Sequence, residues 1–135
     1  MIVDASALLS IVLGEDDRER FYMSLGRSAG SSVSPVNYVE AAIRAEGASD
    51  PRRGEFLDEI IQRFDVRLAS ITPEQAMIAR HAYRRFGRGK HPARLNLGDC
   101  FAYALAKARR EPLLFKGDDL ALAHPDILVE IERAL

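Results

Sequence analysis

The sequence predicts an α/β domain built around a parallel sheet, and two features of its pattern carry that prediction. Short unbroken apolar runs, such as residues 1–3 and 113–115, are typical of strands that are buried on both faces of a parallel sheet. Segments with helical spacing of apolar residues alternate with these runs along the chain. The 135 residues show no linker, repeat or low-complexity tract, so we expect one domain over residues 1–135.

The first half of the chain is predicted to hold two strands and four helices. Residues 1–4 form the first expected strand, and Gly14 is a natural stop for a short helix over residues 5–13. Pro35 suits the first turn of a later helix. The other elements expected here are a helix over 16–25, a weak strand over 31–34, a helix over about 36–47 and a helix over 55–64.

The second half is predicted to continue the alternation. Residues 66–71 are expected to be a strand or an extended connection. Thr72 is a predicted N-cap, Pro73 a first helical residue and Gln75 the partner that closes a capping box, for a helix reaching about residue 86. The next helix covers residues 97–110, with an expected apolar face of Leu97, Phe101, Ala104, Leu105 and Ala108. Strands are then predicted over 112–116 and 127–131.

Composition excludes several classes of protein. With 47% hydrophobic and 29% charged residues, the chain is neither disordered nor fibrous. A net charge of −1 gives no overall attraction to nucleic acid or membrane, so any such contact requires a local patch. The single cysteine, Cys100, excludes an intrachain disulfide and a cysteine-based zinc site. The N-terminus lacks a basic signal-peptide region and the apolar run 7–13 is too short to cross a bilayer, so we expect a cytoplasmic protein.

Four acidic positions are expected to gather at one edge of the sheet. Asp4 and Asp118 lie just beyond the C-terminal ends of two predicted strands, and ligands of open parallel sheets bind beyond the carboxyl ends of the strands. Asp99 lies in the first turn of a helix that begins near that edge. Glu40 lies about one turn into its helix, and helical side chains lean back toward the N-terminus, so its carboxylate can reach the same edge.

Each acid alone has an ordinary structural explanation. Asp99 could simply favour the positive end of its helix, and Asp118 and its neighbour Asp119 could be turn residues. Glu40 could be a residue at the solvent boundary, whereas Asp4, coming straight after a buried strand, is hardest to explain in this way.

Together, the acids predict a cation site. At ~5 Å and an effective dielectric constant of ~20, each pair of carboxylates repels by roughly 3 kcal/mol, so the group needs protons, basic partners or cations. Oxygen ligands without nearby cysteine or histidine favour Mg²⁺ or Mn²⁺, the ions of two-metal nucleases.

Three segments resemble a known family. The opening MIVDASALLSIVLGE, the middle VNYVEAAI and the segment LNLGDCFAYALAKARREPLLFKGDDL occur in an order and at separations similar to those of PIN-domain ribonucleases, most of all the VapC-type toxins. The resemblance covers residues 1 to about 127. It implies a three-layer α/β/α domain with a central parallel sheet of four to five short strands. It also implies a Mg²⁺-dependent endoribonuclease, commonly homodimeric, that a VapB-like antitoxin holds inactive.

The same resemblance assigns roles to single residues. Asp4, Glu40 and Asp99 match the first three acidic positions of the family, and the fourth is placed at Asp118, with Asp119 as the competing position. All four acids are expected both to bind metal and to be catalytic. Ser6 matches a hydroxyl residue that orients a ligand or a water, although a simple helix-start serine is nearly as good an explanation. The chain departs from the family at Leu120, where relatives often have Phe, and at Pro125, where they often have Thr.

A basic loop precedes the helix that carries Asp99. The stretch RRFGRGKHPAR, residues 84–94, contains glycines and a proline that favour a loop, and it is the expected contact for RNA phosphates. A loop whose charges are merely solvated is the alternative. The residues expected to bind RNA are Arg85, Arg88, Lys90 and Arg94.

Three other functions compete with the nuclease. A haloacid-dehalogenase-type phosphatase needs a second aspartate where this chain has Ser6. A receiver-like signalling domain needs an acidic pair after its first strand, where Asp4 stands alone. A catalytically inactive PIN-like interaction module would keep the fold while losing acids, whereas all four positions are acidic here.

Overall fold

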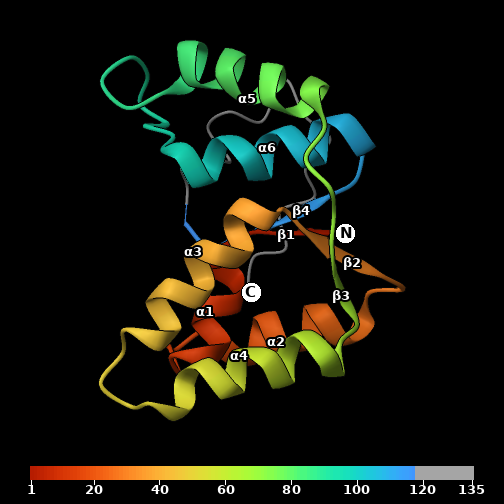
Figure 1. The fold of residues 1–135 in the computed structure, drawn as a ribbon, viewed down its shortest axis with the longest axis vertical. Coiled ribbons are helices and arrows are strands. Elements are labelled where there is room, and N and C mark those ends of the chain that lie inside the picture. Colours follow the sequence, from red (N-terminus) through yellow and green to blue (C-terminus); the bar gives the residue numbers. More distant parts are fainter. Residues whose placement is uncertain (118–135) are drawn as a thin grey trace.

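The computed structural model describes residues 1–117, which form four strands and six helices (Figure 1). In chain order the elements are β1 (Ile2–Val3), α1 (Ala5–Val12), α2 (Arg18–Arg27), β2 (Ser31–Val33), α3 (Pro35–Glu46), α4 (Arg52–Arg63), β3 (Val66–Leu68), α5 (Pro73–Phe86), α6 (Leu97–Arg109) and β4 (Leu113–Leu114). The expected α/β alternation is confirmed, with boundaries that differ by up to three residues from those predicted. The strand predicted over 127–131 lies outside the described residues.

The four strands make one parallel sheet in the order β3-β2-β1-β4. Ile2 of β1 aligns with Ser32 on one side and with Leu113 on the other. Because all strands point the same way, the residues after β1, β2 and β4 lie at one edge of the sheet. That edge is where the sequence predicts the acids to meet.

Helices cover both faces of the sheet and give three layers (Figure 1). Helices α5 and α6 pack on one face, where Ala82, Phe86 and Leu105 join Ile2 and Leu113 in one hydrophobic core. The second core lies on the other face, with Leu8 of α1, Phe21 of α2 and Leu57 of α4 packed against Val3. The central strands are therefore buried from both sides, which is why their sequences are unbroken apolar runs.

Helix α3 lies where the two layers meet. Ala41 and Ala45 join the core on the α1 side, and the helix also contacts α6. Its first turn starts directly after β2, at the carboxyl edge of the sheet. This position brings the side chains of α3 to the edge that the start of α6 also reaches.

Two local predictions are corrected by the structure. Thr72 does cap α5 by accepting from Gln75 N, but the Gln75 side chain donates to Ser70 O and closes no capping box. The predicted apolar face of α6 is shifted, because Leu97 and Ala108 are exposed while Tyr103 is buried. Within residues 1–117 no helix is long and apolar enough to span a bilayer.

Candidate active site

Asp4 is the buried centre of the acidic edge. It follows β1 and caps α1, and only 5% of its surface is exposed. Its Oδ2 accepts hydrogen bonds from Ser6 N at 3.0 Å and from Ser6 Oγ at 2.5 Å. Burial raises the pKa of Asp4, and the hydrogen bonds from Ser6 and Ala5 oppose that rise. The carboxylate is thus held in place by neutral donors at a site that disfavours its charge.

Glu40 faces the same edge from α3. Burial raises the pKa of its carboxyl, and the charge of Asp4 raises it further, while a hydrogen bond from Asn37 and the charge of Arg44 lower it. The structure therefore brings these two predicted acids within electrostatic range of each other. Glu40 also lines a groove of about 790 Å³ between α3 and the start of α6.

Gly98 lets α6 approach Glu40 closely. A Cβ atom at position 98 would lie 2.6 Å from Glu40 Oε1 and 2.7 Å from Glu40 Oε2, well inside van der Waals contact. Only glycine leaves room for the carboxylate in this position.

Asp99 takes part in a capping box at the start of α6. Its Oδ2 accepts from Asn96 N at 3.0 Å, and its backbone N donates to Asn96 Oδ1 at 2.9 Å. The prediction placed Asp99 with Asp4 and Glu40 at a metal site. Within the first 117 residues, however, no three carboxylate, imidazole or thiol groups lie close enough to hold a metal ion. Asp118 and Asp119, the competing fourth positions, lie outside the described residues.

Asn37 connects the acid-bearing elements. It is fully buried in the first turn of α3, three residues before Glu40. Its Nδ2 donates to Gly98 O at 2.9 Å and to Asp4 Oδ1 at 3.4 Å. No role was predicted for this residue from the sequence, although its i−3 spacing from Glu40 places both residues on one helix face.

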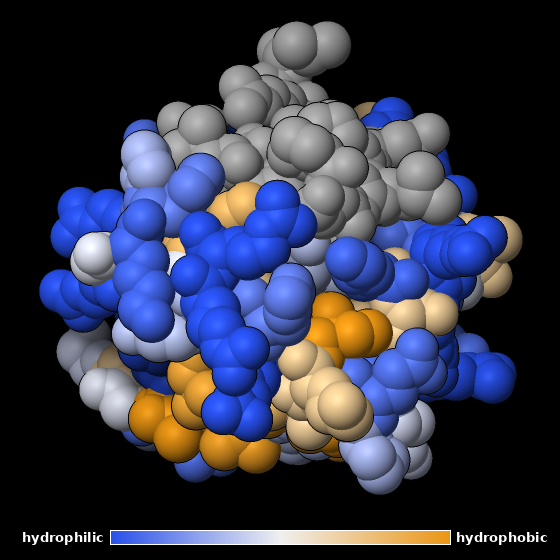
Figure 2. Space-filling model, turned by 90° about the horizontal axis from the view of Figure 1, so that it is seen from above, coloured by the Kyte–Doolittle hydropathy of each residue, from blue (hydrophilic) through white to orange (hydrophobic). Residues whose placement is uncertain are grey.

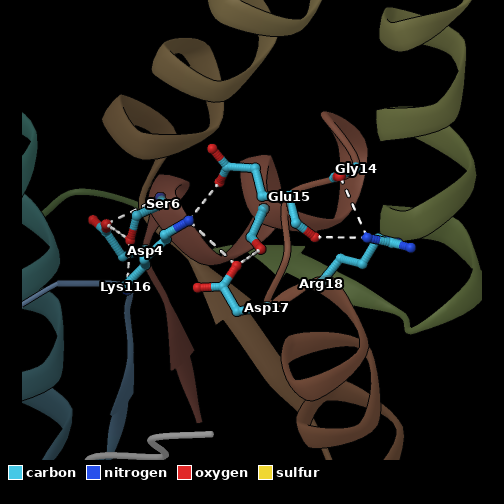
Figure 3. Close-up of polar contacts among 8 residues, drawn as sticks. Asp4, Ser6, Gly14, Glu15, Asp17, Arg18 and Lys116 are labelled. Atoms are coloured by element: carbon cyan, nitrogen blue, oxygen red, sulfur yellow. Dashed lines mark hydrogen bonds and ion pairs between the residues drawn. The ribbon is translucent and has the colours of Figure 1, made fainter.

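Lys116 connects the end of β4 to α1 and to the turn between α1 and α2 (Figure 3). Its backbone N donates to Ser6 Oγ at 2.9 Å, so Ser6 contacts both Asp4 and the end of β4. Its ammonium lies 3.1 Å from Glu15 Oε1 and 3.3 Å from Asp17 Oδ1, and Ser10 Oγ donates to the same Asp17 oxygen. Glu15 raises the pKa of Lys116 by accepting a hydrogen bond, and Asp17 adds to the rise. We call Lys116, Glu15 and Asp17 the lysine clamp.

The basic loop joins α5 to α6 on the side where α6 begins (Figure 1). Its ends are tied together, because Arg88 N donates to Leu95 O and Leu95 N donates to Phe86 O. Arg88, Lys90 and Arg94 are exposed, and Arg85 at the end of α5 is exposed as well. His91 has a structural role, since its Nδ1 accepts from Ala93 N and its ring packs edge-on against Phe86.

The donor set of this edge fits a hard divalent cation. Asp4, Glu40 and Asp99 offer only oxygen atoms, which is the ligand chemistry of Mg²⁺ and Mn²⁺. In the described part of the chain the hydrogen bonds that Asp4 accepts come from the side chains of Ser6 and Asn37 and from the backbone N–H groups of Ala5 and Ser6, all of them uncharged. The buried negative charge thus has no ammonium or guanidinium hydrogen-bonded to it, and a cation would balance it.

Sequence comparison identifies the family. The PIN domain family model matches residues 1–124. The chain belongs to the PIN domain family. Ribonuclease VapC42 of Mycobacterium tuberculosis is 42% identical over 128 residues, covering 94% of this chain and 96% of the relative. Ribonuclease VapC28 of the same species is 44% identical over 120 residues, which cover 88% of this chain and 90% of the relative. Ribonuclease VapC of Mycolicibacterium smegmatis is 41% identical over 129 residues, which cover 92% of this chain and 100% of the relative.

Membership of the PIN family confirms the resemblance drawn from the three sequence segments. It also confirms the three-layer domain with a parallel sheet, of which four strands are seen within residues 1–117. The phosphatase and receiver alternatives lose their basis, because both belong to other families.

Proposed function

We propose that this PIN domain is a metal-dependent endoribonuclease, a VapC-like toxin that a VapB-like antitoxin neutralises. The observation that carries the proposal is the pairing of buried Asp4 with Glu40 at the carboxyl edge of the sheet, where no basic side chain of residues 1–117 is hydrogen-bonded to Asp4. RNA is the proposed substrate because the relatives that are similar over nearly the full chain are named ribonucleases.

In this proposal Asp4, Glu40, Asp99 and Asp118 hold Mg²⁺ or Mn²⁺, with Asp119 as the alternative to Asp118. A divalent ion bound there would supply charge neutralisation at the scissile phosphate and a lower pKa for an attacking water. The chain supplies the rigid frame: Ser6 and Asn37 orient Asp4, and Gly98 leaves room for Glu40. Hydrolysis then needs no nucleophilic side chain.

Cleavage of mixed cellular RNA tests the enzyme proposal. The wild-type protein, freed of antitoxin, is incubated with Mg²⁺, Mn²⁺ or EDTA beside Asp99→Asn and a matched control, Asp58→Asn, on the exposed side of α4. Asn at position 99 can still accept the capping hydrogen bond from Asn96, so the variant should stay folded while losing the charge. We expect metal-dependent cuts in the wild type and the control and none in Asp99→Asn.

An inactive PIN-like interaction module is the second candidate. The observation in its favour is the engagement of Asp99 in the capping box, which leaves Asp4 and Glu40 as the close pair among residues 1–117. Absence of cleavage with every metal, by folded wild-type protein, would select this candidate over the enzyme.

We further propose that the basic loop binds RNA phosphates through Arg85, Arg88, Lys90 and Arg94. These four side chains are exposed, and the loop ends at Arg94, three residues before α6 begins at Leu97. The double variant Arg88→Glu/Lys90→Glu should weaken RNA binding and reduce the slope of log affinity against log salt by about 1 to 2. Arg67→Glu, on exposed β3, is the control; equal slopes in all three proteins would remove the loop from the proposal.

Two surfaces support the proposed protein partners. A mainly apolar groove of about 450 Å³ runs between α1, α2 and α4 and suits an antitoxin segment. The face carrying α5 shows hydrophobic patches among hydrophilic side chains (Figure 2), and this supports a homodimer. Large exposed apolar residues there and on neighbouring helices are Val39, Ile43, Met77, Tyr83 and Leu97. A VapC-like toxin acting on cellular RNA would work in the cytoplasm, which is the location we propose.

A further inference from the structure

The Asn37 side chain is the polar group at the acidic edge that no predicted role accounts for. It is fully buried, and its Nδ2 contacts Gly98 O at 2.9 Å and Asp4 Oδ1 at 3.4 Å. Glu40, one turn later on α3, also has its pKa lowered by a hydrogen bond from Asn37. One amide on α3 thus links Asp4, at the end of β1, to the start of α6, and so joins the three described segments that hold the predicted acids.

The orientation of this amide is fixed by its acceptors. Turning the group around would place Oδ1 against a carbonyl oxygen and a carboxylate oxygen, so Nδ2 must face them. In the present orientation Oδ1 is buried and accepts no hydrogen bond within residues 1–117. A buried oxygen without a donor is unfavourable, and an apolar side chain of similar size would avoid it. The contribution of this amide therefore comes from its N–H donors, whose loss would leave Asp4 Oδ1 and Gly98 O without that partner.

A neutral donor suits a carboxylate that must stay charged. Lysine or arginine at this position would neutralise Asp4 and compete with a cation for its oxygens. The amide stabilises the anion and leaves that charge available. It also fixes the distance between Asp4 and the backbone that leads into Asp99, because Gly98 O is its second acceptor.

We propose that Asn37 is a positioning residue that holds Asp4 and the start of α6 in the geometry required for binding a divalent cation. The proposal rests on the proposed metal-dependent function. Asn37 touches carboxylates and backbone rather than substrate, so its effect should appear first in cation affinity. Partners that orient metal ligands typically change affinity by about 10- to 100-fold when removed.

The test compares Asn37→Leu, which keeps a similar volume without donors, and Asn37→Ala with the wild type. Ser34→Ala is the matched control, because Ser34 is also fully buried at the start of α3 and its hydroxyl has no partner within residues 1–117. The affinity of the folded protein for Mn²⁺ is measured by electron paramagnetic resonance of free Mn²⁺. The melting temperature of the metal-free protein is measured by calorimetry, and RNA cleavage is measured at saturating Mn²⁺.

We expect at least a tenfold loss of Mn²⁺ affinity in both Asn37 variants, and wild-type affinity in Ser34→Ala. Wild-type Mn²⁺ affinity in both variants, with or without a lower melting temperature, would assign Asn37 a purely structural role and overturn the inference. Failure of both variants to fold would overturn it in the same way. A wild type that binds Mn²⁺ but cuts no RNA would refute the proposed function alone, because the affinity comparison still decides the role of Asn37.

Discussion

Removing the charge of Glu40 should stabilise the metal-free protein. In Glu40→Gln the side chain keeps its shape while the repulsion from Asp4, which contributes to the raised pKa of Glu40, disappears. Two charges ~5 Å apart at an effective dielectric constant of ~20 repel by about 3 kcal/mol. Because Glu40 is only half-buried, solvent screening reduces the expected gain to about 1 kcal/mol. For a chain of this length that corresponds to a melting temperature about 3–4 °C higher.

The pH dependence gives the sign of this effect an independent check. Burial and the charge of Asp4 place the folded-state pKa of Glu40 above its ordinary value of 4.5, so the folded protein binds this proton more tightly than the unfolded chain does. Wild-type stability should therefore fall as the pH rises through the folded pKa and recover as the pH drops toward 4.5. The advantage of Glu40→Gln should be full at neutral pH and shrink on acidification.

Calorimetry in EDTA across this pH range is the assay, with Glu59→Gln on the exposed side of α4 as the control. Adding Mn²⁺ should make the wild type more stable than Glu40→Gln. A ligand at 100 times its dissociation constant stabilises the wild type by about 2.7 kcal/mol, and it stabilises the variant, which binds it more weakly, by less. A Glu40→Gln variant less stable than the wild type in EDTA at neutral pH would contradict the prediction, since the carboxylate of Glu40 would then be a structural group.

Three further predictions concern other contacts of the site. Gly98→Ala should keep or slightly raise the melting temperature, since alanine favours helix, yet it should reduce RNA cleavage by displacing the Glu40 carboxylate. Gly26→Ala in α2 is the control. Unchanged cleavage by Gly98→Ala would contradict the close approach of α6 to Glu40. Lys116→Met should lower the free energy of unfolding, measured with urea, by about 0.5–1 kcal/mol in low salt and by less in 1 M NaCl. A loss of stability that does not depend on salt would rule out a stabilising role for the ion pairs of the lysine clamp. Cys100, buried and with a pKa raised to about 11 by burial and by Asp99, should react with a disulfide reagent far more slowly in the folded protein than in urea.

The sequence was sufficient to predict the layers and the edge. Unbroken apolar runs such as Leu113–Phe115 can be satisfied only by burial from both sides, and a parallel sheet then places Asp4 at its carboxyl end. Helical spacing placed Glu40 toward the same edge, and its pKa, raised first by burial and then by the charge of Asp4, agrees with the expected nearness to Asp4. These features depend on local pattern and on chain direction, both of which are visible in sequence.

What the sequence did not predict depends on contacts between distant residues. Asn37 reads as an ordinary polar helix residue until Gly98, 61 positions later, places a carbonyl group beside it. The lysine clamp likewise joins Lys116 to Glu15 across 101 positions. The exposure of Leu97 was missed because periodicity shows that a helix has an apolar face but not how far its partner extends, and α5 packs instead over Cys100 and Tyr103.

The described residues that orient Asp4 stabilise its carboxylate without neutralising its negative charge. Ser6 and Asn37 hold Asp4 with uncharged donors, while the ammonium of Lys116, whose backbone N–H contacts Ser6, pairs with Glu15 and Asp17. Removing a charge and removing a donor should therefore have opposite effects on the metal-free protein: Glu40→Gln raises its stability, and Asn37→Leu lowers it. If Glu40→Gln gained no stability in the absence of metal, repulsion between Asp4 and Glu40 would not act in the folded protein, and the case for a cation at this edge would lose its physical basis.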